Sequence, residues 1–123
     1  MKKVLKASAG TGKTYRLSLE YLAALLTGQD YTEIAVLTFT RKATAEARER
    51  IFEQMQSLET EGEESEVWKN LKEIYPGLEL KPGLIHRCRQ RMLQNKEMVQ
   101  IYTIDSFINR IFREVVAPYL GVY

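Results

Sequence analysis

Apolar residues in this chain gather in short continuous runs, with longer stretches of helical periodicity between them. The clearest run is Ile34-Ala35-Val36-Leu37, which is typical of a parallel strand buried on both faces. Val4-Leu5 and the segment Val99–Thr103 have similar β-strand character. The pattern therefore predicts three strands, near Lys3–Lys6, Ile34–Thr38 and Val99–Thr103.

The first interval between these strands has the period of an amphipathic helix. We expect a helix from about residue 13 to 26, because Leu17, Tyr21 and Leu25 share one face and Gly28 follows as a C-terminal stop. A strand, a helix and a second strand in succession form a right-handed crossover unit. This order indicates an α/β fold built on a parallel sheet.

The second interval is much longer than a simple crossover needs. A helix capped by Thr40 and fading near Gly62 is expected first. Two shorter helices, at about 63–75 and 84–95, are bounded by turns at Pro76-Gly77 and Pro82-Gly83. These shorter helices are interpreted as a small inserted subdomain. The apolar stripe of the longer helix consists of Ala43, Ala47, Ile51 and Met55.

A last helix is expected after the third strand, with Asp105 or Ser106 as its N-terminal cap and Pro118 as its end. Its apolar residues are expected to face inward. They are Phe107, Ile108, Ile111, Phe112, Val115 and Val116.

Composition places limits on the class of protein. A chain of 123 residues is one domain at most, and a net charge of +2 gives no general affinity for nucleic acid. Cys88 is the only cysteine, so no intrachain disulfide forms, and we expect a half-buried, inert thiol in a reducing compartment. No apolar stretch approaches the roughly 18 residues of a membrane span. These observations predict a cytoplasmic protein without a membrane partner.

The chemistry is concentrated in residues 7–14, Ala-Ser-Ala-Gly-Thr-Gly-Lys-Thr, between the first strand and the first helix. A strand, a glycine-bearing loop ending in Gly-Lys-Thr and a helix together indicate a phosphate-binding loop, although Ala7 stands where the first glycine of the general pattern would be. Gly10 and Gly12 allow consecutive amides to point at phosphate oxygens. Lys13 supplies a charge to the β and γ phosphates, and the Thr14 hydroxyl suits Mg²⁺. The predicted nucleotide-binding residues are Ala9, Gly10, Thr11, Gly12, Lys13 and Thr14, with Thr14 also the predicted ligand of Mg²⁺.

Three segments in this order carry a family resemblance. They are residues 7–14, residues 37–51 (Leu-Thr-Phe-Thr-Arg-Lys-Ala-Thr-Ala-Glu-Ala-Arg-Glu-Arg-Ile) and residues 101–107 (Ile-Tyr-Thr-Ile-Asp-Ser-Phe). Together they resemble motifs I, Ia and Ib of the UvrD/RecB-type superfamily 1 DNA helicases. The first segment is most similar to the RecB branch, the β subunits of exonuclease V.

The resemblance implies a partial RecA-like P-loop domain with a three-stranded parallel sheet, flanking helices and a small helical insertion. It also implies ATP-driven movement on single-stranded DNA in recombination and repair, with ATP and Mg²⁺ as cofactors and other helicase–nuclease subunits as partners. The division would be residues 1–58 and 98–123 for the motor and 59–97 for the insertion. The residues implied to contact DNA are Thr38, Phe39, Thr40, Thr103 and Ser106.

Two departures from the family pattern affect these expectations. Asp105 stands where relatives often have histidine, and a carboxylate repels phosphate. No apolar run ends in Asp-Glu, so the acid that would act on the nucleotide's Mg²⁺ and water is missing. We therefore expect an inactive first part of a longer enzyme, which hides its uncovered sheet edges and apolar faces by forming a homodimer.

Two other functions are compatible with the same residues. A small P-loop phosphotransferase would need an arginine-rich lid, which only Arg87, Arg89 and Arg91 offer. A non-catalytic interaction module would keep the loop as a relic. For Phe39 the alternative to stacking on a DNA base is packing in the core.

Overall fold

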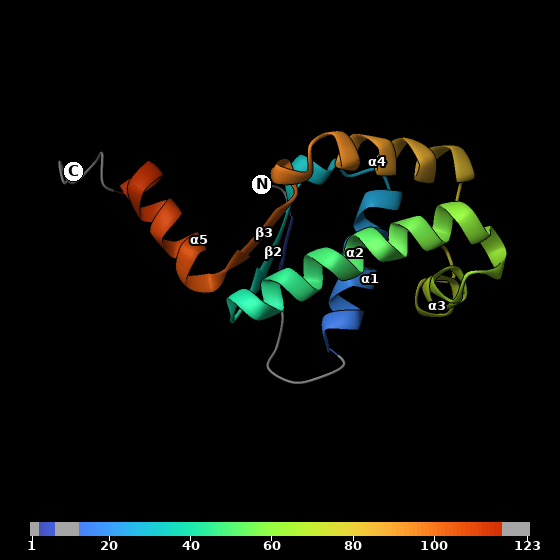
Figure 1. Ribbon diagram of the computed structural model, residues 1–123, viewed down its shortest axis with the longest axis horizontal. Helices are drawn as coiled ribbons and strands as arrows, with labels where there is room; N and C mark the ends of the chain where they lie inside the picture. Colours follow the sequence, from blue (N-terminus) through green and yellow to red (C-terminus); the bar gives the residue numbers. More distant parts are fainter. Residues whose placement is uncertain (1–2, 7–12, 117–123) are drawn as a thin grey trace.

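The computed structural model describes residues 3–6 and 13–116, and its centre is a parallel sheet (Figure 1). The strands are β1 (Lys3–Lys6), β2 (Ile34–Thr38) and β3 (Gln100–Thr103), in the order β1-β2-β3. Every residue of β2 is buried, as the continuous apolar run predicted. The register aligns Thr38 with Thr103, so β2 and β3 end side by side at the carboxyl edge of the sheet.

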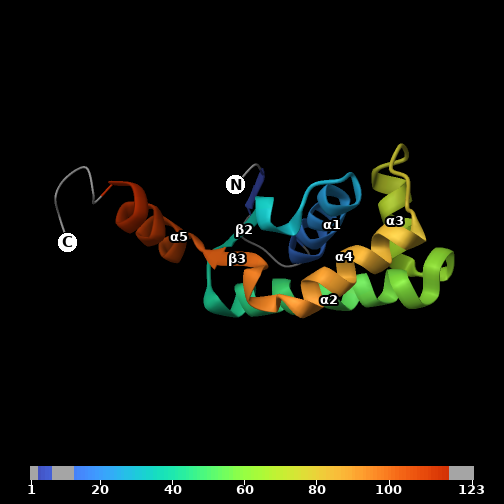
Figure 2. The same cartoon turned by 90° about the horizontal axis from the view of Figure 1, so that it is seen from above.

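Four helices pack together on one side of the molecule (Figure 2). They are α1 (Lys13–Leu26), α2 (Arg41–Glu61), α3 (Glu66–Ile74) and α4 (Pro82–Gln94). Their apolar faces join β1, β2 and β3 in one core, so the helices of the long connection share the core of α1 and α2. The largest fully buried side chains include Tyr21, Ile51, Met55, Leu71, Ile85 and Met92.

The helix boundaries follow local capping chemistry. Gly28, two residues after α1, and Gly62, directly after α2, adopt positive φ angles of 113° and 59°. Residues with a Cβ rarely adopt such angles. Ser65 begins α3 by accepting a hydrogen bond from the amide of Val67. The predicted turn at Pro82-Gly83 is wrong, because Pro82 is the first residue of α4. Proline suits this position, since the first helical amide has no partner within the helix.

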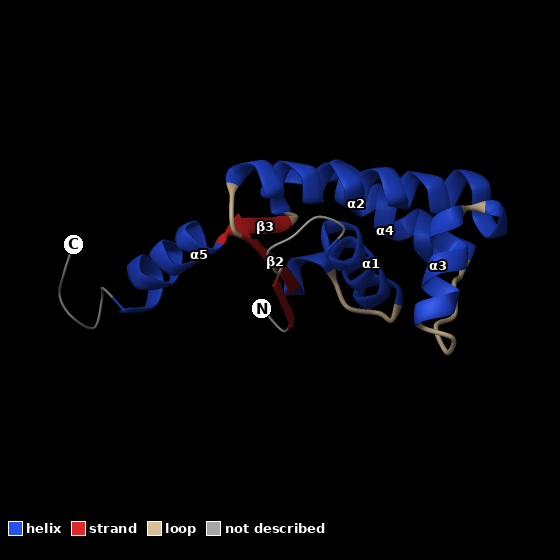
Figure 3. Ribbon diagram, turned by 90° about the horizontal axis from the view of Figure 1, so that it is seen from below, coloured by secondary structure: helices blue, strands red, loops and turns tan. Residues whose placement is uncertain are grey.

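The last helix differs from the prediction in its cap and in its burial. α5 (Ile104–Ile111) is capped by Thr103, not by Asp105 or Ser106, and continues as a π-helical turn, η4 (Phe112–Val116). Its apolar residues do not face inward, and Phe107 is only partly buried. Figure 3 shows α5 extending away from α1–α4. The large apolar side chains of α5 and η4 that are 39% to 58% exposed are Ile108, Ile111, Phe112 and Val115.

Candidate nucleotide and nucleic-acid site

The predicted phosphate loop falls largely outside the described residues. Ala9, Gly10, Thr11 and Gly12 are not among them, and Lys13 and Thr14 form the first turn of α1 without described side chains. The frame around the loop is described. β1 ends at Lys6, runs parallel to β2, and is followed after the loop by the N-terminus of α1. This is the strand and helix frame that a phosphate loop requires.

Tyr15 is the first described side chain after that loop, and it joins three helices. The Asn70 side-chain amide of α3 donates a hydrogen bond to the Tyr15 hydroxyl at 2.6 Å. The Arg50 guanidinium of α2 lies 5.6 Å from the centroid of the Tyr15 ring. These contacts hold the start of α1 against α2 and α3. Sequence reasoning missed them, because the three residues are far apart in the chain.

The end of β2 carries the best-connected hydroxyl among the predicted site residues. Thr38 is 1% exposed, and its Oγ1 lies 2.5 Å from Thr44 Oγ1, 3.2 Å from the carbonyl oxygen of Thr40 and 3.3 Å from that of Tyr102. Thr40 caps α2, because its Oγ1 accepts a hydrogen bond from the amide of Ala43 at 3.0 Å. Both threonine side chains are therefore engaged within the fold.

Phe39 lies between these two threonines and is 54% exposed. Core packing, the alternative role for this residue, is therefore wrong. Its ring stands at the carboxyl edge of the sheet, where open α/β sheets bind ligands. Arg41 and Lys42, both exposed, form the first turn of α2 beside it.

The end of β3 has a similar construction. Thr103 Oγ1 accepts a hydrogen bond from the amide of Ser106 at 3.2 Å and donates to the Ser106 hydroxyl at 2.9 Å. Asp105 is exposed in the first turn of α5, where a carboxylate is favourable for the helix dipole. The structure therefore brings Thr38, Phe39, Thr40, Thr103 and Ser106 to one edge of the sheet.

An aromatic and basic cluster beside this edge was not predicted. The Tyr102 and Phe107 rings are stacked with centroids 6.1 Å apart. The Arg110 guanidinium lies 5.4 Å from the Tyr102 centroid and donates to the Tyr102 hydroxyl. Glu114 accepts a hydrogen bond from Arg110 at 3.3 Å. The spacing of Phe107, Arg110 and Glu114 along one helix was the available signal.

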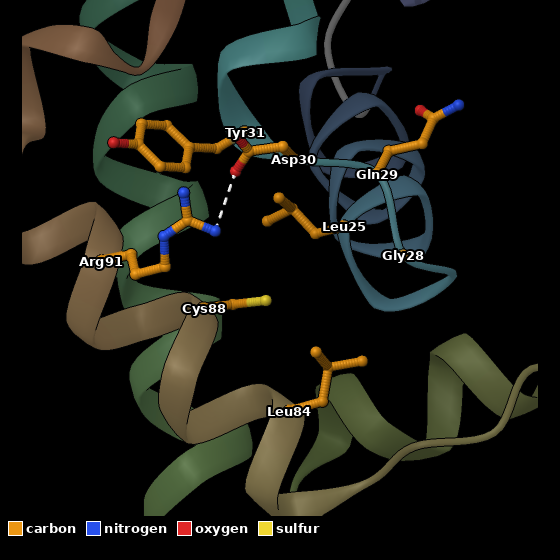
Figure 4. A pocket seen from close by; sticks show the side chains of 8 residues that line it. All are labelled: Leu25, Gly28, Gln29, Asp30, Tyr31, Leu84, Cys88 and Arg91. Atoms are coloured by element: carbon orange, nitrogen blue, oxygen red, sulfur yellow. Dashed lines mark ion pairs between the residues drawn. The ribbon is translucent and has the colours of Figure 1, made fainter.

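A pocket lies at the amino end of β2, away from this edge (Figure 4). Arg91 forms an ion pair with Asp30 at 3.1 Å and lies over the Tyr31 ring at 5.4 Å from its centroid. Cys88 points into the pocket between Leu25 and Leu84. Burial raises the pKa of the Cys88 thiol, more than the nearby Arg91 and Arg87 lower it, which agrees with the expected inert, half-buried thiol.

Two of the arginines of α4 are paired within the fold. Arg89 donates a hydrogen bond to Glu59 at 3.1 Å, while Arg91 pairs with Asp30.

Within residues 3–6 and 13–116 no cluster of His, Cys, Asp and Glu is arranged to hold a metal ion. None of the described helices is long and apolar enough to cross a membrane.

Comparison with known proteins supplies the family. A family model described as the UvrD/REP helicase N-terminal domain matches residues 2–118. The chain belongs to this family. The fold agrees with this assignment, as a partial RecA-like α/β domain with three parallel strands and flanking helices. No solved structure gives a significant match.

Three curated relatives agree with the family. RecBCD enzyme subunit RecB of Haemophilus influenzae is 33% identical over 128 residues. The match covers 90% of this chain and 10% of the relative. An ATP-dependent helicase/nuclease subunit of Lactobacillus acidophilus is 28% identical, and the match covers 89% of this chain and 8% of the relative. The corresponding Lactobacillus helveticus protein, which has the same description, is 30% identical, with 85% of this chain and 7% of the relative covered.

This helicase-domain chain spans a tenth or less of the length of these curated relatives. The family match identifies the chain as a helicase N-terminal domain segment. The family assignment favours neither the phosphotransferase nor the relic module. Two of the three arginines that a lid would use, Arg89 and Arg91, are paired with Glu59 and Asp30.

Proposed function

We propose that this chain is the nucleotide-binding first segment of a motor that uses ATP to move along single-stranded DNA. The observation that carries the proposal is the exposed Phe39 ring at the carboxyl edge of the sheet, between the end of β2 and the N-terminus of α2. The larger protein would be one component of a helicase–nuclease complex, working with other subunits in recombination and repair. Such a motor works on the cell's DNA, and we propose a cytoplasmic location for it.

The nucleotide would be held at the start of α1. In this proposal Ala9, Gly10, Thr11 and Gly12 supply backbone amides, Lys13 contacts the β and γ phosphates, and the Thr14 hydroxyl ligates Mg²⁺. The β1–loop–α1 frame fits that role, because the N-terminus of a 14-residue helix follows the loop and favours negative charge. Bound Mg²⁺ neutralises phosphate charge. The chain has no Asp-Glu sequence to orient water, so we assign it binding and not hydrolysis.

The DNA strand would cross the ends of β2 and β3. A phenyl ring stacks on a base of any kind, and this stacking contributes about 1–3 kcal/mol per base. Thr40, Thr103 and Ser106 lie at the first turns of α2 and α5, where helix dipoles favour phosphate. Thr38 lies at the same edge of the sheet, directly before Phe39 in the chain. We keep the division into motor segments 1–58 and 98–123 and an insertion at 59–97 as part of the proposal.

Binding of a fluorescent oligo-dT to the full chain, measured by anisotropy, tests the DNA part. Phe39→Ala is expected to weaken binding by about 5- to 150-fold, the equivalent of one lost stack. Met98→Ala is the matched control, because Met98 is 52% exposed but lies before the amino end of β3. Equal affinities for wild type and Phe39→Ala would refute the stacking role, and no binding by the wild type would refute DNA binding by this segment.

A second proposal concerns the isolated chain. The exposed apolar side chains of α5 and η4 form a face that water-soluble monomers rarely leave uncovered, and we propose that two copies bury it against each other as a homodimer. Sedimentation at micromolar concentration should show a dimer that Ile111→Glu dissociates and Met98→Glu does not. A 14.3 kDa species for the wild type would contradict the homodimer.

A further inference from the structure

The buried hydroxyl of Thr38 joins three elements at the carboxyl edge of the sheet. It belongs to β2, contacts the carbonyl of Tyr102 in β3, and meets the hydroxyl of Thr44 in the first turns of α2. Tyr102 is 64 residues away in the sequence. The hydroxyl therefore lies at the point where the two strands and α2 come together.

The protons of the two hydroxyls limit how these contacts are made. Each threonine has one proton to donate, and the 2.5 Å contact between Thr38 and Thr44 uses one of them. If Thr38 donates to Thr44, Thr44 is free to donate to the Thr40 carbonyl at 3.0 Å. If Thr44 donates instead, Thr38 donates to the carbonyl of Thr40 or Tyr102. In every arrangement the Thr38 hydroxyl donates its proton to a group of the fold.

These bonds fix the backbone on both sides of Phe39. On one side Thr38 is buried and anchored. On the other side, the carbonyl of Thr40 accepts a hydrogen bond from the amide of Thr44 at 3.0 Å, and the hydroxyl of Thr40 accepts one from the amide of Ala43. Phe39 is thus a projecting ring on a short anchored segment. A ring held in this way loses little conformational freedom when a base stacks on it.

We infer that Thr38 is a positioning residue that presents Phe39 to the DNA strand and does not itself contact the strand. The DNA part of this inference rests on the proposed function. Its structural part, that the Thr38 hydroxyl holds the backbone of Phe39 in place, does not. The two parts are therefore tested by separate measurements.

The first measurement is a double-mutant cycle in oligo-dT binding by the full chain. Thr38→Val keeps the shape of the side chain and removes the hydroxyl, Thr38→Ser keeps the hydroxyl, and Phe39→Ala removes the ring. Thr60→Val is the matched control, because the Thr60 hydroxyl donates to the Gln56 carbonyl within α2, away from the sheet edge.

Thr38→Val is expected to weaken binding by about 3- to 10-fold, a part of one stacking interaction, and Thr38→Ser is expected to restore it. In the Phe39→Ala background the same substitution should have no further effect, because residues that act through one another are not additive. Thr60→Val should bind as the wild type does. An equal loss from Thr38→Val with and without the Phe39 ring would overturn the inference and indicate a direct DNA contact.

The second measurement is amide hydrogen exchange of the free chain. Thr38→Val should speed exchange at residues 39–44 several-fold and leave α1 and α4 unchanged, while Thr38→Ser should not. Unchanged exchange at residues 39–44 would overturn the positioning role whatever the chain does with DNA. Faster local exchange in a chain that binds no oligo-dT would keep the positioning role and refute the proposed function.

Discussion

Replacing Arg48 with methionine should destabilise the fold by removing the link between α2 and the approach to β3. The Arg48 guanidinium donates to the Lys96 carbonyl at 3.0 Å and to the Val99 carbonyl at 3.2 Å. These carbonyls belong to the first residue of the turn η3 (Lys96–Met98) and to the residue directly after it. β3 pairs with β2, and Arg48 ties the chain just before β3 to a helix.

The size of the loss follows from the two hydrogen bonds. A bond with a charged donor contributes about 1.5–3 kcal/mol, and the bond to Lys96 is exposed to water, so the low end applies to it. The sum is about 3–4.5 kcal/mol, a large part of the roughly 5–15 kcal/mol that holds a domain folded. For a chain of this size the corresponding fall in Tm is about 15 °C.

Urea unfolding followed by circular dichroism measures this change. Arg48→Lys should lower the free energy of unfolding by an intermediate amount. Lysine keeps the charge but lacks the planar guanidinium that reaches both carbonyls. Arg87→Met is the matched control for loss of charge, since Arg87 is exposed on α4. The free energies of unfolding of Arg48→Met and Arg87→Met should differ clearly. If they differ by less than about 0.5 kcal/mol, a spread usual for surface substitutions, the two hydrogen bonds of Arg48 do not stabilise the fold as argued.

The nucleotide loop and Cys88 lead to four further predictions. The chain alone should not hydrolyse ATP, because it lacks the Asp-Glu pair that a motor uses with Mg²⁺ and water; DNA-stimulated phosphate release that Lys13→Ala abolishes would contradict this. It should bind ATP weakly, with a Kd on the order of high micromolar to millimolar, or about 4–6 kcal/mol, and calorimetry giving nanomolar affinity would be the opposite result. The raised pKa of Cys88 should make alkylation at pH 8 slower than for a free thiol. Because the pKa of Cys88 is raised in the folded state, its contribution to the free energy of unfolding is complete below pH 9.0, the ordinary pKa of a thiol. That contribution is lost as the pH rises through the folded pKa. In Cys88→Ser this fall in stability at high pH should be absent.

The sheet and the first helix were predictable because each leaves a local pattern in the sequence. A strand buried on both faces needs a continuous apolar run, and residues 34–37 have one. The bounds predicted for β1, α1 and β2 agree with the structure. The end of α1 is set by Gly28, whose positive φ selects glycine. These features need no knowledge of distant contacts.

The environment of the last helix was not predictable in the same way. Periodicity identifies which face of a helix is apolar, but it does not identify what covers that face. Ile108 and Val115 were assigned to a core and are exposed. The cap was also wrong, because Thr103, Asp105 and Ser106 are all good caps and only the end of β3 at Thr103 decides among them.

The candidate site was located from sequence more accurately than its chemistry was assigned. The motif placed Thr38, Phe39 and Thr40 at the end of a strand, where they are. It did not distinguish the anchored threonines from the projecting ring, because successive strand residues point to opposite sides and the bond from Thr38 to Tyr102 crosses 64 residues. Tyr102, Phe107 and Arg110 were also missed. The spacing of Phe107 and Arg110 was a local signal, but their contact with Tyr102 exists only once β3 and α5 are in place.

The way hydroxyls are used at this edge bears on what kind of DNA contact the segment makes. Thr38, Thr40 and Thr103 each direct their hydroxyl to groups of the protein itself, so these side chains do not extend toward base edges. In the proposed function the groups left for DNA are the first-turn amides of α2 and α5 and the ring of Phe39. Backbone amides contact phosphates and an aromatic ring stacks on any base, and neither reads sequence. A motor that advances along DNA meets every base in turn, and a site built from such contacts lets each base pass with similar affinity.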